Sequence, residues 1–309
     1  MQNSFMNLDH VRALAAAVDE GTVEGAGFVL GITASAASQR IRALESRLGQ
    51  VLMRRTNPIT VTDAGAAVLR YARQVELLES EAMDRLHGIA ADAPAGAPRE
   101  PGARREPTVL RIGVNADSLA TWFRPVFAEV ADWDDIVIRL DVVDQGKAVP
   151  LLTSGEVLGT ITSAESSAYG TQVRHLGSMR YLAVATRGLL ARFGADPDAP
   201  AEVDLATLPM VNFGRDDDLQ LDFLDRRGIA TVPPMSVVPS SAEFAAAVAA
   251  GVGWGMIPVM QLEGINAELV PITADPGVDV PLYWHHWTLA SDKLARLTEA
   301  LGRAAALMR

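Results

Sequence analysis

The chain contains no cysteine, which excludes disulfide bonds and thiolate chemistry. No apolar run approaches the roughly 20 residues that a membrane-spanning helix needs. The N-terminus also lacks the basic-then-apolar pattern of a secretion signal. These absences predict a cytoplasmic protein that has no membrane partner.

Patterns that mark common enzyme sites are missing as well. The five histidines are scattered, and His285 and His286, adjacent on a predicted strand, point to opposite faces, which is poor geometry for one metal ion. The sequence has no phosphate-binding Gly-Lys-Ser/Thr loop, no nucleophile elbow and no dinucleotide glycine fingerprint. We therefore predict that the protein is not an enzyme and uses no metal and no cofactor.

Positive charge is scarce overall but is unevenly distributed. The chain has 27 Lys and Arg against 38 Asp and Glu, a net charge of -11, which argues against a general polyanion binder. Residues 1–61, however, hold six arginines and five acidic residues, whereas the rest holds 21 basic and 33 acidic residues. Five of the six arginines fall within residues 40–55, which predicts a local basic patch.

Residues 22–55 begin with two short helical patterns joined by a turn at Gly31-Ile32, and Thr33 occupies the N-cap position of the second helix. The stripe of that helix predicted to pack inward consists of Ala37, Ile41, Leu44 and Leu48. The opposite, polar face consists of Ser35, Ser38, Gln39 and Arg42. An ordinary amphipathic surface helix is the alternative for such a stripe taken alone.

The neighbouring elements favour a more specific interpretation. A helix is predicted over residues 8–18, and strands over 51–56 and 59–61, joined by a turn at Asn57-Pro58, form a small wing that carries Arg54 and Arg55. This order predicts a winged helix-turn-helix whose second helix enters a groove of duplex DNA.

The run Ser-Ala-Ala-Ser-Gln-Arg-Ile-Arg-Ala-Leu-Glu, with the later Leu-Gly, Leu and Arg-Arg-Thr, closely resembles the DNA-binding signature of the LysR-type transcriptional regulators. The resemblance begins at Met6 and extends along the whole chain. It implies promoter DNA as a partner, with RNA polymerase as a further possible one. The DNA-binding residues that we predict are Thr33, Ser35, Ser38, Gln39, Arg40, Arg42, Arg54 and Arg55.

A long helix is predicted from Thr62 to about Gly88. Its apolar seam consists of Val68, Tyr71, Val75, Leu78 and Ala82. Such a seam favours a partner helix, although packing against the chain's own domain is an alternative. The resemblance implies that this linker helix pairs between subunits of a homodimer or homotetramer. Residues 88–108 are rich in Pro, Gly and Ala, which predicts a flexible linker.

Beyond the linker, short apolar strands alternate with helices, which predicts an α/β fold with a largely parallel sheet. One helix is expected from Ser118 to about Ala131. By resemblance, the region forms two lobes like those of a periplasmic binding protein. The predicted domains are a winged helix-turn-helix at 6–61, a linker at 62–108 and an effector-binding domain at 109–309. Its lobe I comprises about 109–161 and 266–309, and its lobe II about 162–265.

The segment from Asn115 to Phe123 lies where a first strand ends and a helix begins, a usual place for ligands in open α/β sheets. Its Asn-Ala-Asp-Ser-Leu and Thr-Trp closely resemble the branch of the family that senses lysine or arginine and controls a basic amino-acid exporter. Ser118 and Leu119 are expected to donate to a carboxylate, and Asp117 to accept from an α-ammonium group. The alternative is that Asp117 and Ser118 only cap the helix.

Other strand ends supply further candidates, and a lysine or arginine ligand needs a carboxylate at its far end. The acids eligible for that role are Asp144, Glu165, Asp216 and Glu243. Tryptophans such as Trp122 line the cleft in one interpretation and belong to the core in the other. The effector-binding residues that we predict are Asn115, Asp117, Ser118, Leu119, Trp122, Thr162, Ser163, Phe213, Asp216 and Glu243.

Two other functions remain open at this point. In the first, a protein of the same fold regulates a catabolic operon and senses an acidic or aromatic metabolite. Alternatively, the protein is an architectural DNA binder that inhibits replication initiation without any ligand.

Overall fold

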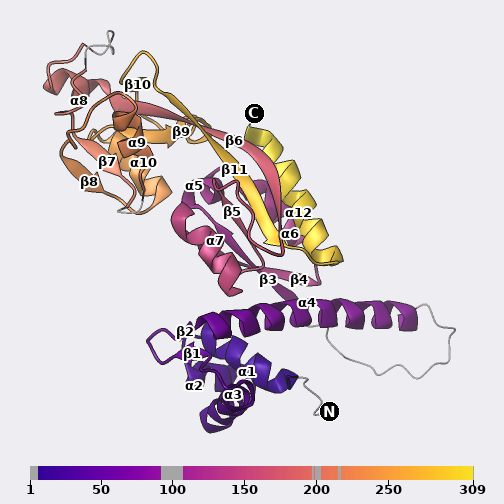
Figure 1. Ribbon diagram of the computed structural model, residues 1–309. Coiled ribbons are helices and arrows are strands. Elements are labelled where there is room, and N and C mark those ends of the chain that lie inside the picture. Colours follow the sequence, from indigo (N-terminus) through magenta and orange to yellow (C-terminus); the bar gives the residue numbers. More distant parts are fainter. Residues whose placement is uncertain (1–5, 92–106, 197, 199–202, 215–216, 309) are drawn as a thin grey trace.

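The computed structural model describes residues 6–91, 107–196, 198, 203–214 and 217–308. Three parts follow one another along the chain (Figure 1): a small N-terminal head, one long helix, and a larger α/β domain. The long helix α4 (Asp63–Ala91) lies between the head on one side and strands β3 and β4 of the α/β domain on the other. Most of the predicted linker, residues 92–106, lies outside the described residues.

The head packs three helices and a two-stranded wing around one apolar core. Its elements are α1 (Leu8–Asp19), α2 (Val23–Val29), α3 (Ala34–Leu48), β1 (Met53–Arg54) and β2 (Thr60–Val61). Thr33 Oγ1 accepts from the Ala36 N–H at 3.1 Å and so starts α3, and Gly31 makes the preceding turn at φ +64°. The predicted helix-turn-helix and small wing are confirmed, and the two strands of the wing pair antiparallel.

Helix α4 packs against two cores of its own chain. Leu69 and Ala72 are buried in the head, whereas Leu77 is buried in the core of the α/β domain. The predicted seam is only partly available to a partner helix. Val68 is 7% exposed and belongs to the head core. Tyr71 and Val75 are half-buried, and only Leu78 and Ala82 stand exposed.

The α/β domain is built on one seven-stranded mixed sheet in the order β10-β6-β11-β5-β3-β4, with β9 also paired to β6. Its strands are β3 (Thr108–Val114), β4 (Ile136–Val142), β5 (Gly159–Thr162), β6 (Thr171–Thr186), β9 (Gly255–Pro258), β10 (Leu269–Pro271) and β11 (Gly277–Trp287). The expectation of a largely parallel sheet is wrong. Only the pairings of β3 with β4 and with β5 are parallel, and the other four pairings of this sheet are antiparallel. The chain leaves the first lobe along β6 and returns along β11, so these long strands pair antiparallel.

Two lobes share these long strands (Figure 1). The first lobe, next to α4, adds α5 (Ala116–Ala120), α6 (Arg124–Ala131), α7 (Gln145–Ser154) and α12 (Asp292–Ala305). The second adds α8 (Arg187–Arg192), α9 (Leu219–Asp225), α10 (Ser241–Ala249), α11 (Val259–Leu262) and the parallel pair β7 (Met210–Asn212) and β8 (Met235–Val237). The single helix expected over 118–131 is wrong, since Thr121 leaves helical geometry and Pro125 opens the separate helix α6.

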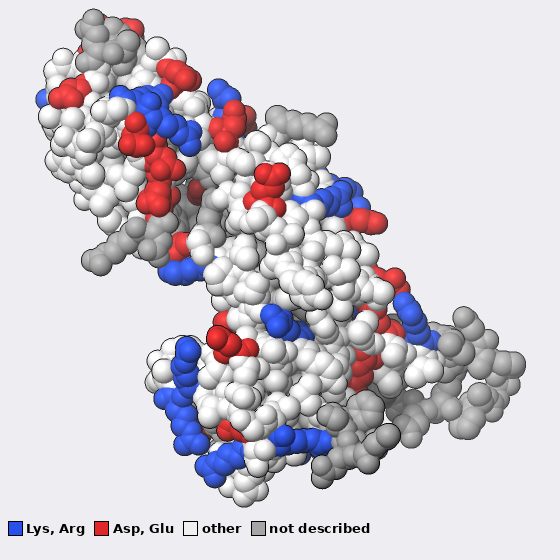
Figure 2. Space-filling model, viewed as in Figure 1, with Lys and Arg blue, Asp and Glu red and all other residues white. Residues whose placement is uncertain are grey.

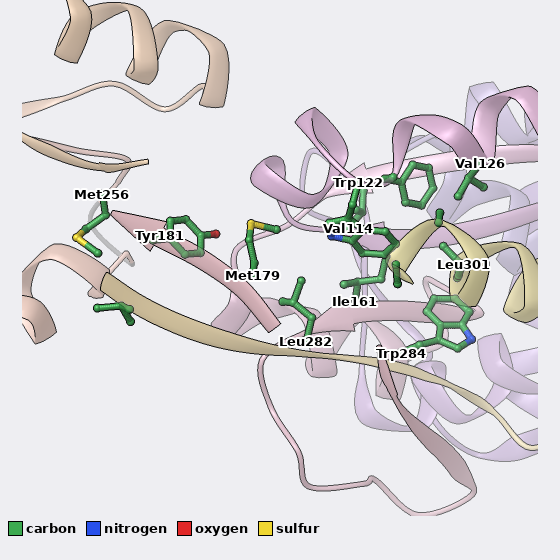
Figure 3. Close-up of a cluster of buried hydrophobic side chains, with 14 of the residues drawn as sticks. Val114, Trp122, Val126, Ile161, Met179, Tyr181, Met256, Leu282, Trp284 and Leu301 are labelled. Carbon is green, nitrogen blue, oxygen red and sulfur yellow. The ribbon is translucent and has the colours of Figure 1, made fainter. Parts of the chain in front are cut away.

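A continuous apolar core runs along the sheet through both lobes. Figure 3 shows it extending from Met256 and Tyr181, through Leu282, to Trp122 and Trp284. Both of these tryptophans are completely buried. Among the described residues, no helix is both long and apolar enough to cross a bilayer.

Candidate DNA-binding face and ligand cleft

Helix α3 presents one buried and one exposed face, as its period predicts. Ala37, Ile41 and Leu44 are fully buried against the head core. The prediction that Leu48 belongs to the buried stripe is wrong. Leu48 is 37% exposed, because it lies in the last turn of α3 just before the left-handed Gly49. On the other face Ser35, Gln39 and Arg42 are exposed and Ser38 is half-buried.

A groove of about 430 Å³ separates the N-terminal end of α3 from the wing. Ser35 and Ser38 line one side, Arg55 and Asn57 line the other, and Glu24 contributes a carboxylate. Arg54 and Arg55 are exposed, Arg40 is half-buried, and the exposed Thr33 is occupied by its capping hydrogen bond. Figure 2 shows basic side chains gathered over the head, whereas acidic ones gather on the second lobe.

A second cavity, of about 440 Å³, lies between the two lobes of the α/β domain. Asn115, Asp117 and Ser163 reach it from the first lobe, and Phe213 and Phe244 reach it from the second. Its charged lining is strongly one-sided. Among the residues that the structure describes there, it comprises Asp117, Asp144, Asp217, Asp218, Asp222, Asp279 and Arg226.

Side chains from two other elements hold Asp117, one of the residues that line this cleft. The Tyr181 hydroxyl of β6 donates to Asp117 Oδ2 at 2.9 Å, and the Ser241 hydroxyl of α10 donates to Oδ1 at 2.7 Å. Burial raises the pKa of Asp117, although these two hydrogen bonds act in the opposite direction. Burial and the neighbouring Asp117 carboxylate raise the pKa of Tyr181 as well.

Asp217 is the second carboxyl of the cleft with a shifted pKa. Burial raises it, and the charge of Asp117 adds to the rise, against backbone hydrogen bonds from Leu219 and Phe213. Two acids that repel each other in a partly closed cleft favour a bound cation over an anion.

The local role of the 115–119 segment differs from the predicted one. Asn115, and not Asp117 or Ser118, is the N-cap of α5, because its Oδ1 accepts the Ser118 N–H at 2.7 Å. The Leu119 N–H donates to the Asn115 carbonyl at 3.1 Å, so neither backbone donor is free for a ligand. Ser118 is fully buried, and neither it nor Leu119 lines the cavity.

Three further candidates also lie away from the cavity. Trp122 is completely buried in the core beside Phe123, in agreement with the interpretation that this tryptophan belongs to the core. Thr162 is fully buried in β5, and Glu243 is an exposed residue of α10 that pairs with Ser240. Asp216 lies outside the described residues. Asn115, Asp117, Ser163 and Phe213 are thus the predicted residues that the structure brings together.

Sequence reasoning missed Tyr181 and Asp217, and it did not identify Ser241 as a partner of Asp117. Asp217 adjoins the predicted Asp216, so the strand-end argument came within one residue of it. Tyr181 and Ser241 lie 64 and 124 residues from Asp117, and no local pattern connects them to it.

Known proteins similar to this chain were found by sequence and by structure. A lysine export transcriptional regulatory protein LysG of Corynebacterium efficiens is 40% identical over 303 residues, covering 97% of this chain and 98% of that protein. Full-length LysG of Corynebacterium glutamicum with bound effector Arg is 37% identical, with a TM-score of 0.72 and coverage of 98% and 99%. ArgP of Mycobacterium tuberculosis is 37% identical, with a TM-score of 0.77 and coverage of 96% of each chain.

Two family models account for most of the sequence. Residues 8–66 match the bacterial regulatory helix-turn-helix protein of the lysR family, and residues 103–306 match the LysR substrate binding domain. Together they cover the head with its wing and the α/β domain with its cleft. The chain therefore belongs to the LysR family of transcriptional regulators.

Proposed function

We propose that this regulator responds to lysine or arginine and controls a gene for amino-acid export. The observation that carries the proposal is the cleft between the lobes, whose described lining has six aspartates and a single arginine. A carboxylate-rich cavity selects cationic ligands, because an unpaired buried cation is costly and a paired one is not. The similarity to lysine export regulators and to a LysG with bound arginine supports the same ligand class and target.

Within the cleft, Asp117 and Asp217 are the proposed acceptors for the ligand's cationic groups. A carboxylate has about four acceptor sites, so Asp117 keeps capacity beyond its bonds to Tyr181 and Ser241. Asn115 Nδ2 is a buried donor with no partner among the described residues, and Ser163 lines the same cavity. We assign these two side chains to the ligand's carboxylate, in place of the occupied N–H groups of Ser118 and Leu119.

DNA recognition is assigned to the exposed face of α3 and to the wing. Ser35, Ser38, Gln39 and Arg42 face the major groove, and Arg54 and Arg55 contact the backbone or the minor groove. The working unit is a homodimer or homotetramer acting on cytoplasmic DNA, with Leu78 and Ala82 at the exposed part of the linker seam. The domain limits remain those proposed from the sequence, 6–61, 62–108 and 109–309.

Calorimetry with a small ligand panel tests the proposal. We expect saturable binding of lysine or arginine and none of norleucine, which has an uncharged side chain of similar length. Asp117→Asn should weaken binding by about 2 kcal/mol or more, roughly 30-fold, because a hydrogen-bonded charge pair is lost. Glu243→Gln removes the same charge outside the cavity and should leave the affinity unchanged.

Two outcomes would contradict the proposal. Saturable binding of an acidic or aromatic carboxylate, with none of the basic amino acids, would favour a regulator of a catabolic operon. Normal lysine and arginine affinity in the Asp117→Asn variant would remove Asp117 from the ligand site.

A further inference from the structure

A single carboxylate, Asp19, connects the three parts of the molecule. It lies at the C-terminal end of α1 in the head. Its Oδ1 pairs with Arg73 of α4, and its Oδ2 pairs with Arg111 Nη2 of β3 at 2.5 Å. Arg73 also pairs with Glu76 at 3.3 Å on its own helix. Head, linker helix and α/β domain therefore meet at one acid.

This junction is shielded from water. The side chains of Asp19, Arg73 and Arg111 are 15%, 8% and 12% exposed. Two other pairs between the parts are open to solvent: Arg12–Glu79 is 39% and 45% exposed, and Arg85–Asp292 is 67% and 85% exposed. The more shielded Lys293–Asp84 pair joins α12 to α4 and does not include the head. Exposed pairs contribute little, whereas removing one partner of a shielded pair leaves an uncompensated charge.

The two arginines also lie close enough to repel each other. Burial lowers the pKa of Arg111, and the neighbouring Arg73 and Arg139 guanidinium groups add to that effect, against the attraction of Asp19. Without the Asp19 charge, Arg73 keeps Glu76 and Arg111 keeps only the attraction of Asp141, so the repulsion between the two guanidinium groups is less compensated. Asp19 is therefore the acid that offsets this repulsion where the head meets the α/β domain.

Strand β3 links this junction to the ligand cleft. Arg111 lies in the middle of β3, which ends at Val114 and passes directly into Asn115 and Asp117. Asn115 and Asp117 line the cavity between the lobes. At about 3.3 Å per strand residue, Arg111 and Asp117 lie within roughly 20 Å along one stretch of chain.

We propose that Asp19 is a latch that ties the DNA-binding head to the α/β domain of its own chain, and that ligand binding at the end of β3 changes the state of this latch. The first half stands on the contacts of Asp19 alone. The second half rests on the proposed function of the cleft. Head position is then set by the ligand through β3 and Arg111, within one subunit.

Distance measurement between two spin labels tests the latch in the ligand-free protein. Because the chain has no native cysteine, labels can be placed at cysteines introduced at the exposed Ser46 of α3 and Ala295 of α12. Labelled subunits are diluted into excess unlabelled protein, so that only distances within one chain are observed. We expect a narrow distribution in the parent protein, and a broader one with a longer mean in Asp19→Asn and Arg111→Gln.

The matched control is Arg85→Gln, which breaks an exposed pair between α4 and α12 and should leave the distribution unchanged. Arg111→Lys keeps the charge and should restore the narrow distribution, which distinguishes loss of the latch from misfolding. Distributions of Asp19→Asn and Arg111→Gln that match the parent would overturn the latch.

A lysine titration of the same samples, run beside calorimetry, tests the coupling. A shift of the distribution on lysine binding in the parent, absent from Arg111→Gln, supports the second half of the proposal. Lysine that binds by calorimetry without any shift overturns the coupling alone. Absence of both lysine and arginine binding by calorimetry contradicts the proposed function and leaves the ligand-free distances as the test of the latch.

Discussion

At the scale of single residues, Asp117 determines how the cleft responds to pH. Burial raises its pKa above the ordinary 3.8, and burial is also the largest cause of the raised pKa of Asp217. A bound cation favours the ionised carboxylates, so binding releases protons that the empty cleft holds. We therefore expect lysine affinity to rise as pH approaches the raised pKa values of these carboxyls and to level off once pH exceeds them.

Calorimetry in two buffers with different ionisation enthalpies measures the released protons directly. Asp117→Asn should reduce both the proton release and the slope of affinity against pH. The ligand-free fold follows the opposite trend, because a carboxyl whose pKa is raised on folding adds stability at low pH that is lost as pH rises through that pKa. Proton release that is unchanged in Asp117→Asn would show that this carboxyl is not responsible.

At the scale of elements, the contact between α7 and α4 has no room for another atom. Gly155 is the C-cap of α7 with a φ of +81°, and a Cβ there would lie 2.6 Å from the Arg70 backbone nitrogen. Arg70 Nη1 also donates to the Thr153 carbonyl at 2.9 Å. We expect Gly155→Ala to lower the free energy of unfolding by about 1–3 kcal/mol beyond the backbone strain, as overpacking does.

Gly194 supplies the matched control for that substitution. Its φ of +74° resembles that of Gly155, but a Cβ there meets no described atom within 4 Å. Gly194→Ala therefore carries the strain without the clash. Urea denaturation of both variants measures the difference, and equal losses would mean that α7 and α4 can separate at no cost.

The elements also show which features a sequence can predict. The two faces of α3 follow from a 3.6-residue period and local capping, so Thr33, Ile41 and Gln39 lie where the pattern places them. The antiparallel pairing of β6 with β11 depends on where the chain crosses between lobes, which no local period encodes. A local motif identifies Asp117 as a candidate, but only tertiary folding brings its partners Tyr181 and Ser241 into contact with it.

At the scale of the whole molecule, positive charge lies on the part that binds DNA and negative charge on the part that contains the ligand cleft. The chain has a net charge of -11, yet the exposed groups of the head around α3 and the wing include Arg42, Arg54 and Arg55. Figure 2 shows this separation on one face of the molecule. The acidic remainder repels DNA, so contact is directed to the head, and binding must weaken as salt screens the arginines.

Fluorescence anisotropy with a promoter fragment over a series of salt concentrations measures that dependence. Arg55→Ala should lower the slope of log K against log salt by about 0.9, the value for one lost phosphate contact. Gln39→Ala with Arg42→Ala should instead cost about 1–3 kcal/mol for each base contact and weaken sequence preference. Arg192→Ala, which removes an exposed charge on α8 far along the chain, should change neither quantity. Promoter affinity that survives the double substitution intact would exclude the face of α3 as the surface that reads DNA.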